Sequence, residues 1–275
     1  NMFLDAELHA AYKIANTPML NFPFPHLYIE NIFSEDFYSK IQENLLETKE
    51  MISMADLYSN NSGLSSYKDR LVVDFTMAES VQKIREDRRE FWVSFEENFS
   101  ENIGNLLRLK FKRYLDMRFK YLENVSFKHQ MQLVNDKKNY SLGPHTDKPN
   151  KVISVLIYLP KDRSQIETGT SLYLPKDQNS LDKKNPHQHY PPEQFHKVIT
   201  IPFLPNSALC FIKTNNSYHG VEKLKMEDTN RWSLQYNLYL TDETLEKEII
   251  AKKKHQAENN SEAPIPKSPS AKFSI

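Results

Sequence analysis

The sequence predicts an α+β fold with a mainly β core, arranged as a sandwich or jelly roll and supported by helices near the N-terminal end. Two observations support this prediction. Helical periodicity dominates up to about residue 120, and a series of short segments rich in β-branched and aromatic residues follows. Several short strands in succession are typical of a sandwich or a jelly roll. The 275 residues are enough to bury such a core.

The first 78 residues contain candidate helices and extended segments. Ser34 precedes Glu35 and Asp36, an order typical of an N-cap followed by an acidic first helical turn. We therefore expect a helix from Ser34 to about Leu46. The other elements expected here are a helix at 4–15, an extended segment at 23–33, a polar loop at 58–67 and a strand at 70–77.

Residues 79–117 show long helical stretches. Phe91, Phe95 and Phe99 recur at every fourth position, so they share one helical face. An aromatic stripe at this spacing is typical of core packing, which is how we interpret it.

Strands are expected from residue 127 onwards. The candidates are 127–135, 151–159, 170–174, 196–203, 207–213 and 231–240. We divide the chain into a mostly helical N-terminal support at 1–120 packed on the same domain, a β core at 121–242, a C-terminal helix at 243–256 and a disordered tail at 257–275.

The composition excludes several classes of function. Lys plus Arg and Asp plus Glu both number 36, so the formal net charge is zero and electrostatic binding to nucleic acid or an anionic membrane is not indicated. A single cysteine, Cys210, excludes an internal disulfide framework and a multi-cysteine zinc site. No apolar run approaches the roughly 20 residues of a membrane span. We expect a cytoplasmic protein.

A candidate metal motif lies just before the apolar strand at 151–159. His145 and Asp147 are separated by one residue, so in an extended chain both side chains leave the same face. An imidazole, a carboxylate and a second imidazole form the facial triad of non-haem Fe(II) oxygenases. The short motif alone is not specific, because a turn with a capping carboxylate has the same residues.

A second histidine and an unusual strand follow. His219 lies in a polar loop after the apolar strand at 207–213, and twelve residues later Arg231 opens another strand. One face of this strand is polar, whereas the other is apolar. The polar face either meets water or lines a barrel that binds a charged ligand, and Arg is the natural anchor for a carboxylate. The polar face holds Arg231, Ser233, Gln235, Asn237 and Tyr239, and the apolar face Trp232, Leu234, Tyr236, Leu238 and Leu240.

The series His145-x-Asp147, His219 and Arg231-x-Ser233 resembles the Fe(II)/2-oxoglutarate-dependent dioxygenase superfamily, most closely its prolyl-4-hydroxylase-like branch. The resemblance covers roughly residues 125–242 and implies a double-stranded β-helix, a jelly-roll or cupin-like fold, for the 121–242 core. "ETGTSLYLP" resembles the Gly-Gly-x-Leu segment of that branch, with Thr168 in place of the first Gly. The segments "VISVLIYLP", "PNSALCFI" and "SYHGVEKL" are also similar to segments of that branch.

The resemblance implies roles for individual residues. It implies Fe(II) held by His145, Asp147 and His219, with these three and Arg231 as the catalytic set, and 2-oxoglutarate as cosubstrate with O₂. Ascorbate is a candidate reductant. The residues implied for 2-oxoglutarate are Arg231 and Ser233 at its distal carboxylate, Tyr158 as a further donor, and Tyr140 and Gln132; those for the substrate are Gln235, Asn237 and Lys151.

The function expected is hydroxylation of an unactivated C–H bond in a small molecule or an amino-acid-derived substrate, with release of succinate and CO₂. A peptidyl, prolyl-type hydroxylase is one alternative, and a non-catalytic jelly-roll binding module is another. A cupin-like metalloenzyme that does not use 2-oxoglutarate would leave Arg231 unexplained. The histidine-rich segment 185–197 is interpreted as a loop between strands, with lining of the substrate entrance as its alternative role.

Overall fold

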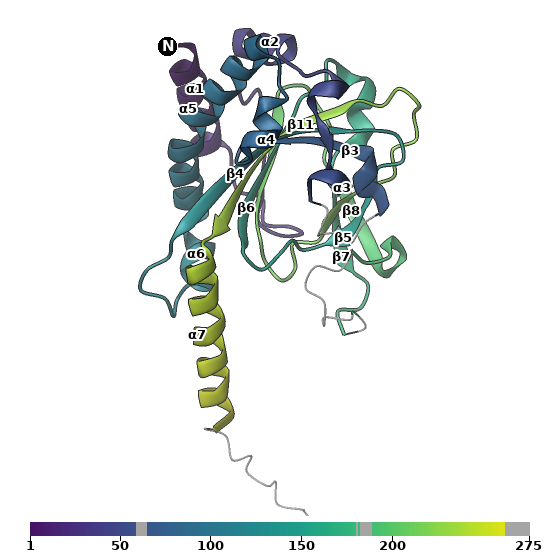
Figure 1. The fold of residues 1–275 in the computed structure, drawn as a ribbon. Coiled ribbons are helices and arrows are strands. Elements are labelled where there is room, and N and C mark those ends of the chain that lie inside the picture. The colour runs from purple at the N-terminus through teal and green to yellow at the C-terminus, as the bar shows by residue number, and fades with distance from the viewer. Residues whose placement is uncertain (59–64, 180, 182–188, 262–275) are drawn as a thin grey trace, which may run out of the picture.

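Two antiparallel sheets form the centre of the computed structural model, which describes residues 1–58, 65–179, 181 and 189–261 (Figure 1). The larger sheet has the strand order β1-β9-β6-β11-β4-β3-β2, and the smaller has the order β5-β10-β7-β8. A mixed fold with a mainly β core and supporting helices is therefore confirmed.

The strands match the expected segments closely. The larger sheet contains β1 (His26–Glu30), β2 (Ile52–Ser53), β3 (Arg70–Asp74), β4 (Phe127–Asp136), β6 (Lys151–Tyr158), β9 (Ser207–Ile212) and β11 (Arg231–Leu240). The smaller contains β5 (Leu142–His145), β7 (Ser171–Pro175), β8 (Phe195–Thr200) and β10 (His219–Val221). All six strands expected after residue 120 are confirmed, whereas β5 and β10 were not expected.

The helices are concentrated in the first 120 residues. They are α1 (Met2–Asn16), α2 (Glu35–Glu43), α3 (Met54–Leu57), α4 (Ala78–Gln82), α5 (Glu86–Lys110), α6 (Lys112–Arg118) and the C-terminal α7 (Asp242–Ser261). Short 3₁₀ turns lie at Thr48–Glu50, Ser65–Asp69, Arg163–Thr168 and Pro192–Gln194. Ser34 caps α2 as expected, because its hydroxyl accepts from the amide of Phe37 at 3.3 Å.

One face of the larger sheet packs against the N-terminal helices. α1 and α5 lie side by side over this face, and Phe91, Phe95 and Phe99 are buried in the same apolar cluster as Leu234 and Tyr236 of β11 (Figure 1). The interpretation of the phenylalanine stripe as core packing is confirmed. The residues on the opposite face of β11 line a cavity between the two sheets, as the barrel alternative required.

Some predicted boundaries need correction. Strands β1, β2 and β3 come from the first 120 residues but belong to the same sheet as the core strands, so helices and sheet are not separated at residue 120. α2 ends at Glu43 rather than near Leu46, with Asn44 as its C-cap. The tail was predicted to begin at 257, but α7 continues to Ser261, because Gln256, Ala257 and Glu258 are good helix formers. Most of the polar loop expected at 58–67, and the tail from 262, lie outside the described residues.

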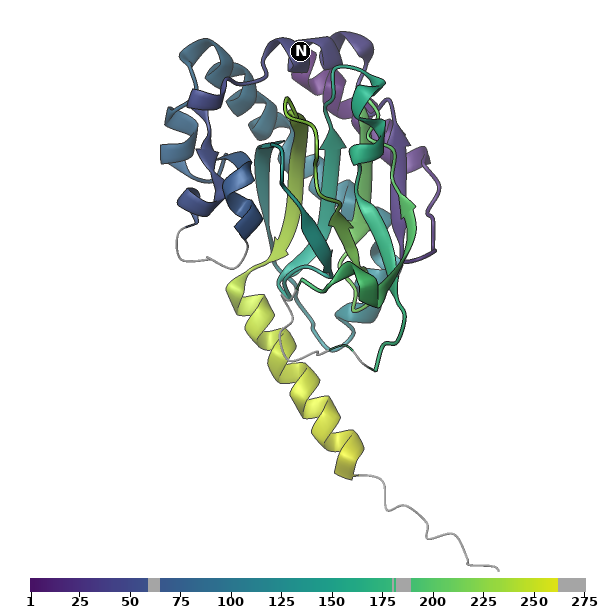
Figure 2. The same ribbon diagram turned by 90° about the vertical axis from the view of Figure 1, so that its right-hand side faces the viewer.

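Helix α7 leaves the sheet at its lower end and extends away from the body of the molecule (Figures 1 and 2). Its base is held by Arg118 of α6, whose Nε donates to Glu248 at 3.0 Å. Across the part of the chain that the structure describes, no helix is both long and apolar enough to span a membrane.

Gly104 gives a test of this packing. A Gly→Ala change inside a helix usually stabilises a protein by about 0.5–1 kcal/mol. Here, however, an added Cβ would lie 2.5 Å from the Tyr236 hydroxyl oxygen, which is itself held by a 2.8 Å hydrogen bond to the Ser100 carbonyl. We expect Gly104→Ala to lower the free energy of unfolding by about 1–3 kcal/mol in urea titrations.

The matched control is the same change in a Tyr236→Phe background. The nearest remaining atom would then be a ring carbon at 3.7 Å, which is ordinary contact, so we expect Gly104→Ala to be neutral or stabilising there. Stabilisation of equal size in both backgrounds would contradict the close contact between α5 and β11.

Candidate active site

A cavity of about 1090 Å³ lies between the two sheets. Its walls come from β4, β6 and β11 of the larger sheet and from β5 and β10 of the smaller one, with further residues from β3 and the segments around α3. All three candidate metal ligands line it, and so does every residue of the polar face of β11. The barrel interior is thus polar, which agrees with the second of the two alternatives for the polar face of β11.

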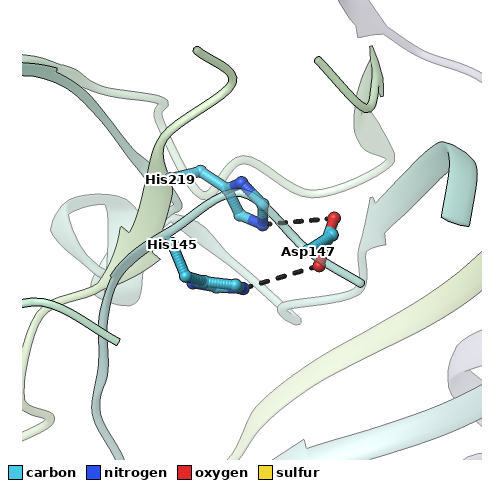
Figure 3. A group of neighbouring side chains, drawn as sticks. All are labelled: His145, Asp147 and His219. Atoms are coloured by element: carbon cyan, nitrogen blue, oxygen red, sulfur yellow. Dashed lines mark ion pairs between the residues drawn. The ribbon is translucent and has the colours of Figure 1, made fainter. Parts of the chain in front are cut away.

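His145, Asp147 and His219 converge at one point of this cavity (Figure 3). The Nε2 atom of His145 lies 3.5 Å from one carboxylate oxygen of Asp147, and that of His219 lies 3.6 Å from the other. One potential ligand atom from each residue falls within 4.8 Å of the other two. Ligand atoms about 2.1 Å from one ion lie about 3 Å apart at right angles, so a small contraction would complete a site. Two imidazoles and one carboxylate match the donor set of a non-haem Fe(II) centre.

Backbone carbonyls fix the orientation of both imidazoles. The Nδ1 of His145 lies 3.0 Å from the Gly143 carbonyl oxygen, and that of His219 lies 2.9 Å from the Ser217 carbonyl oxygen. A carbonyl only accepts, so Nδ1 carries a proton in both rings, and in a neutral ring Nε2 is then the nitrogen with a lone pair for a metal ion. Burial lowers the pKa of His219 to about 3, which keeps this imidazole neutral. Both rings are therefore preset as metal ligands.

Asp147 is held in a backbone conformation that few side chains adopt. Its φ of 64° lies in the left-handed region, where Asp is tolerated better than most residues. Its carboxylate accepts from Ser154 at 3.3 Å and pairs with Lys151 at 3.4 Å. Burial alone would raise the pKa of Asp147, but the nearby Lys151 ammonium outweighs burial and holds it well below its usual range. The carboxylate is thus charged and ready to bind a cation.

The structure corrects two expectations about this motif. Asp147 is not part of an extended chain with His145, since its positive φ turns the backbone directly after β5. His219 is not in a loop but is the first residue of β10, and it is the direct cross-strand partner of His145. Both strands are too short, and too rich in Gly, Pro and His, to show strand alternation in the sequence. The pairing of β5 with β10 brings the two histidines together.

Arg231 lies at the beginning of β11 and is fixed on three sides. Its Nη1 donates to Asp136 at 2.7 Å, and its Nε donates to the Thr168 carbonyl at 2.5 Å. The guanidinium carbon lies 4.7 Å from the centre of the Phe203 ring. No partner for its Nη2 is found among the described residues, although the side chain is almost completely buried and lines the cavity. One end of the guanidinium is thus left for an anionic ligand.

Two further observations test whether these residues fit 2-oxoglutarate. Ser233, two residues after Arg231 on the same face, has a buried hydroxyl without a hydrogen-bond partner among the described residues. Asp136 is shared by Arg70 and Arg231, so the buried group keeps a surplus positive charge. An unsatisfied hydroxyl beside a surplus cation is what a ligand carboxylate would satisfy. The residues fit the distal carboxylate of 2-oxoglutarate.

The three other residues expected to contact the cosubstrate do not all line the cavity. Tyr158 lines the cavity, but its hydroxyl donates to Thr170 at 2.8 Å. Tyr140 is buried, its hydroxyl has no hydrogen-bond partner among the residues that the structure describes, and its ring lies 4.3 Å from the Arg70 guanidinium; it does not line the cavity. Gln132 lines the cavity, and its side-chain amide donates to Tyr58 at 2.6 Å. Of the three, only Tyr140 lies behind the cavity wall.

The residues expected to contact the substrate also line the cavity. Lys151 is already paired with Asp147, so it contacts a candidate metal ligand in this structure. Asn237 is buried, and its Oδ1 has no hydrogen-bond partner among the described residues. Next to it, Gln130 donates to Asp74 at 2.6 Å, while its own oxygen lies 3.4 Å from the Tyr239 hydroxyl. With Gln132, Gln235 and Tyr58, these side chains form a wall of amides and phenols.

The sequence interpretation missed several residues of the site. His189 belongs to the segment interpreted as a loop, yet its ring stacks on His145 at 4.2 Å and lines the cavity. For His189, the structure is closer to the alternative in which this segment lines the substrate entrance. His187 lies outside the described residues, and His196 is exposed on β8. Arg70 and Asp136 were not singled out, although an Arg opening one strand and an Asp ending another were visible signals.

A family model that matches part of the chain agrees with this geometry. Residues 130–239 match the family model of the 2OG-Fe(II) oxygenase superfamily. No curated protein matches the chain. A prolyl-4-hydroxylase of Pseudomonas putida is 10% identical, with 84% of this chain and 98% of that chain covered and a TM-score of 0.41. The α-ketoglutarate-dependent epimerase SnoN of nogalamycin biosynthesis is 11% identical, with 85% and 83% covered and a TM-score of 0.47.

A prolyl hydroxylase of Trichoplax adhaerens is 12% identical, with 88% of this chain and 92% of that chain covered and a TM-score of 0.37. These likenesses are remote, and the assignment rests on the family model. The matched range begins in β4 and ends in β11, so the converging triad and the fixed arginine both lie inside it. Residues 130–239, which contain both of these features, therefore match the 2OG-Fe(II) oxygenase superfamily, whose members are oxidoreductases that use Fe(II) and 2-oxoglutarate.

Proposed function

We propose that His145, Asp147 and His219 hold Fe(II), and that Arg231 and Ser233 bind the distal carboxylate of 2-oxoglutarate. The single observation that supports this best is the convergence of the three ligand atoms within 4.8 Å in a cavity that Arg231 also lines. With O₂, the bound iron and cosubstrate supply the oxidising chemistry that converts a C–H bond to C–OH as 2-oxoglutarate becomes succinate and CO₂.

The chain's own residues provide position and charge for this chemistry. Gly143 and Ser217 hold the two imidazoles in the metal-binding tautomer through their carbonyl oxygens. Asp136, Thr168 and Phe203 fix the Arg231 guanidinium before any ligand arrives, so little side-chain entropy is lost on binding. His145, His219 and Arg231 are almost completely buried, which strengthens their charged and polar contacts.

We propose a small polar molecule as the substrate, of the metabolite or amino-acid-derived type. A cavity of about 1090 Å³ has room for 2-oxoglutarate together with a second small molecule, since ligand pockets usually measure about 300–1000 Å³. The cavity wall carries Gln130, Gln235 and Asn237, and the Asn237 carbonyl oxygen has no hydrogen-bond partner in the described part of the chain. Such a wall favours a substrate that donates hydrogen bonds through hydroxyl or amine groups.

Removing Arg231 tests the cosubstrate assignment. We expect Arg231→Ala to weaken 2-oxoglutarate binding by about a hundredfold or more, because losing one partner of a buried ion pair costs about 3–5 kcal/mol. The affinity for Mn(II), a redox-inert substitute for Fe(II), should stay within about threefold, since Arg231 is not among the metal ligands. Isothermal titration calorimetry measures both affinities.

The matched control is Arg88→Gln, because Arg88 pairs with buried Glu50 on the helical side at 2.6 Å. It should change neither affinity. Equal 2-oxoglutarate affinity in Arg231→Ala and the parent protein would refute the role of Arg231.

A substrate screen read by succinate formation tests the substrate class. The compounds are free amino acids, hydroxylated metabolites and amines, with proline-containing peptides as a separate arm and Asp147→Ala as the blank. We expect stimulation by a small polar compound, and Asn237→Ala should raise the KM for that compound by about tenfold, the size of one lost hydrogen bond, without changing the KM for 2-oxoglutarate.

Stimulation by peptides alone would favour a peptidyl hydroxylase. Absence of succinate with every compound, together with no metal binding, would favour a binding module.

A further inference from the structure

Two arginines and one aspartate form a buried group beside the site. Arg70 begins β3, Asp136 ends β4 and Arg231 begins β11, and the register pairs Asp136 with both arginines. The exposed fractions of the three residues are 7%, 0% and 2%, so water contributes little to their solvation. This group belongs to the fold itself, because the pairing of three neighbouring strands creates it.

The hydrogen bonds divide Asp136 between the two cations. Arg70 holds both carboxylate oxygens, with Nε at 2.6 Å and Nη2 at 3.0 Å. Arg231 shares the second oxygen through Nη1 at 2.7 Å. The Arg70 guanidinium also lies over the ring of Tyr140 at 4.3 Å. Arg70 is thus the main partner of Asp136, and Arg231 is the secondary one.

The charges of this group do not balance. Two cations and one anion leave one net positive charge in a buried environment, where an uncompensated charge is costly. If Arg70 were neutral, Asp136 and Arg231 would neutralise each other, and little attraction would remain for a ligand carboxylate. The surplus charge therefore depends on Arg70, although Arg231 is the arginine on the same strand and face as Ser233.

We propose that Arg70 is a specificity-determining residue: it offsets the charge of Asp136, so that Arg231 selects a 2-oxo acid with a distal carboxylate over one without. The proposal rests on the proposed function, since it assumes that Arg231 meets that carboxylate. Asp136 in turn positions Arg231 by holding its Nη1. Removing Arg70 should then weaken 2-oxoglutarate binding through charge, whereas Ser233 and the metal ligands stay in place.

The test compares two ligands on the Mn(II)-loaded protein by isothermal titration calorimetry. 2-Oxoglutarate and 2-oxovalerate both have five carbons, but 2-oxovalerate lacks the distal carboxylate. Arg70→Gln should weaken 2-oxoglutarate binding by about tenfold to a hundredfold, because it removes one unit of positive charge from a buried region near the ligand. It should leave 2-oxovalerate binding unchanged. Arg88→Gln should change neither.

A double variant separates charge from structure. Arg70→Gln with Asp136→Asn restores one net positive charge and leaves an amide oxygen to accept from Arg231. We expect its preference for 2-oxoglutarate over 2-oxovalerate to return to within about threefold of the parent value. The explanation by charge would be overturned if the double variant bound 2-oxoglutarate as weakly as Arg70→Gln does. It would also be overturned if Arg70→Gln bound both ligands as the parent does.

Arg70→Lys covers the case in which Arg70→Gln does not fold. Lysine keeps the charge but loses the two-point contact with Asp136, so the preference for 2-oxoglutarate should be retained, and its loss would overturn the proposal. Arg231→Ala distinguishes a failure of the proposed function from a failure of the role proposed for Arg70. If that variant keeps the full preference for 2-oxoglutarate, the proposed function fails; if it loses the preference while Arg70→Gln keeps it, only the role of Arg70 fails.

Discussion

The antiparallel pairing of β11 with β4 on one side and β6 on the other is the constraint on which the rest of the structure depends. Because side chains alternate along a strand, one face of β11 completes the core against α1 and α5 while the other lines the cavity. A shift of one residue in this register would exchange the two faces and put Arg231 into the apolar core. The apolar residues of β11 therefore fix the position of its polar ones.

The smaller sheet supplies the second constraint. β10 pairs with β5 so that His219 lies opposite His145, and β7 holds β10 from the other edge. The triad thus consists of His145 and His219 on two short strands and of Asp147, whose φ is positive. Strands this short are not stable in isolation, so the triad depends on the rest of the fold. The larger sheet forms a rigid support, and the strand pairing in the smaller sheet brings the side chains of the triad together.

Charge in the cavity is arranged in two separate groups. Around Asp147, one carboxylate meets Lys151 and two imidazoles, a setting that a divalent cation would change. Around Asp136, two arginines meet one carboxylate, a setting that an added carboxylate would balance. A cation site and an anion site in one cavity suit a cosubstrate that chelates a metal at one end and carries a carboxylate at the other.

The sequence by itself determined the strands after residue 120, the phenylalanine stripe of α5, the two faces of β11 and the residues that form the triad, because each is expressed in local periodicity or in a short motif. Only the tertiary structure decided that His219 pairs with His145, that His189 stacks on it, and that Arg70 and Asp136 join Arg231. The partners in these contacts are separated by between 44 and 95 positions, so no local pattern encodes them. They exist because distant strands are hydrogen-bonded in one register, and that register is set by burying the apolar faces of the sheets.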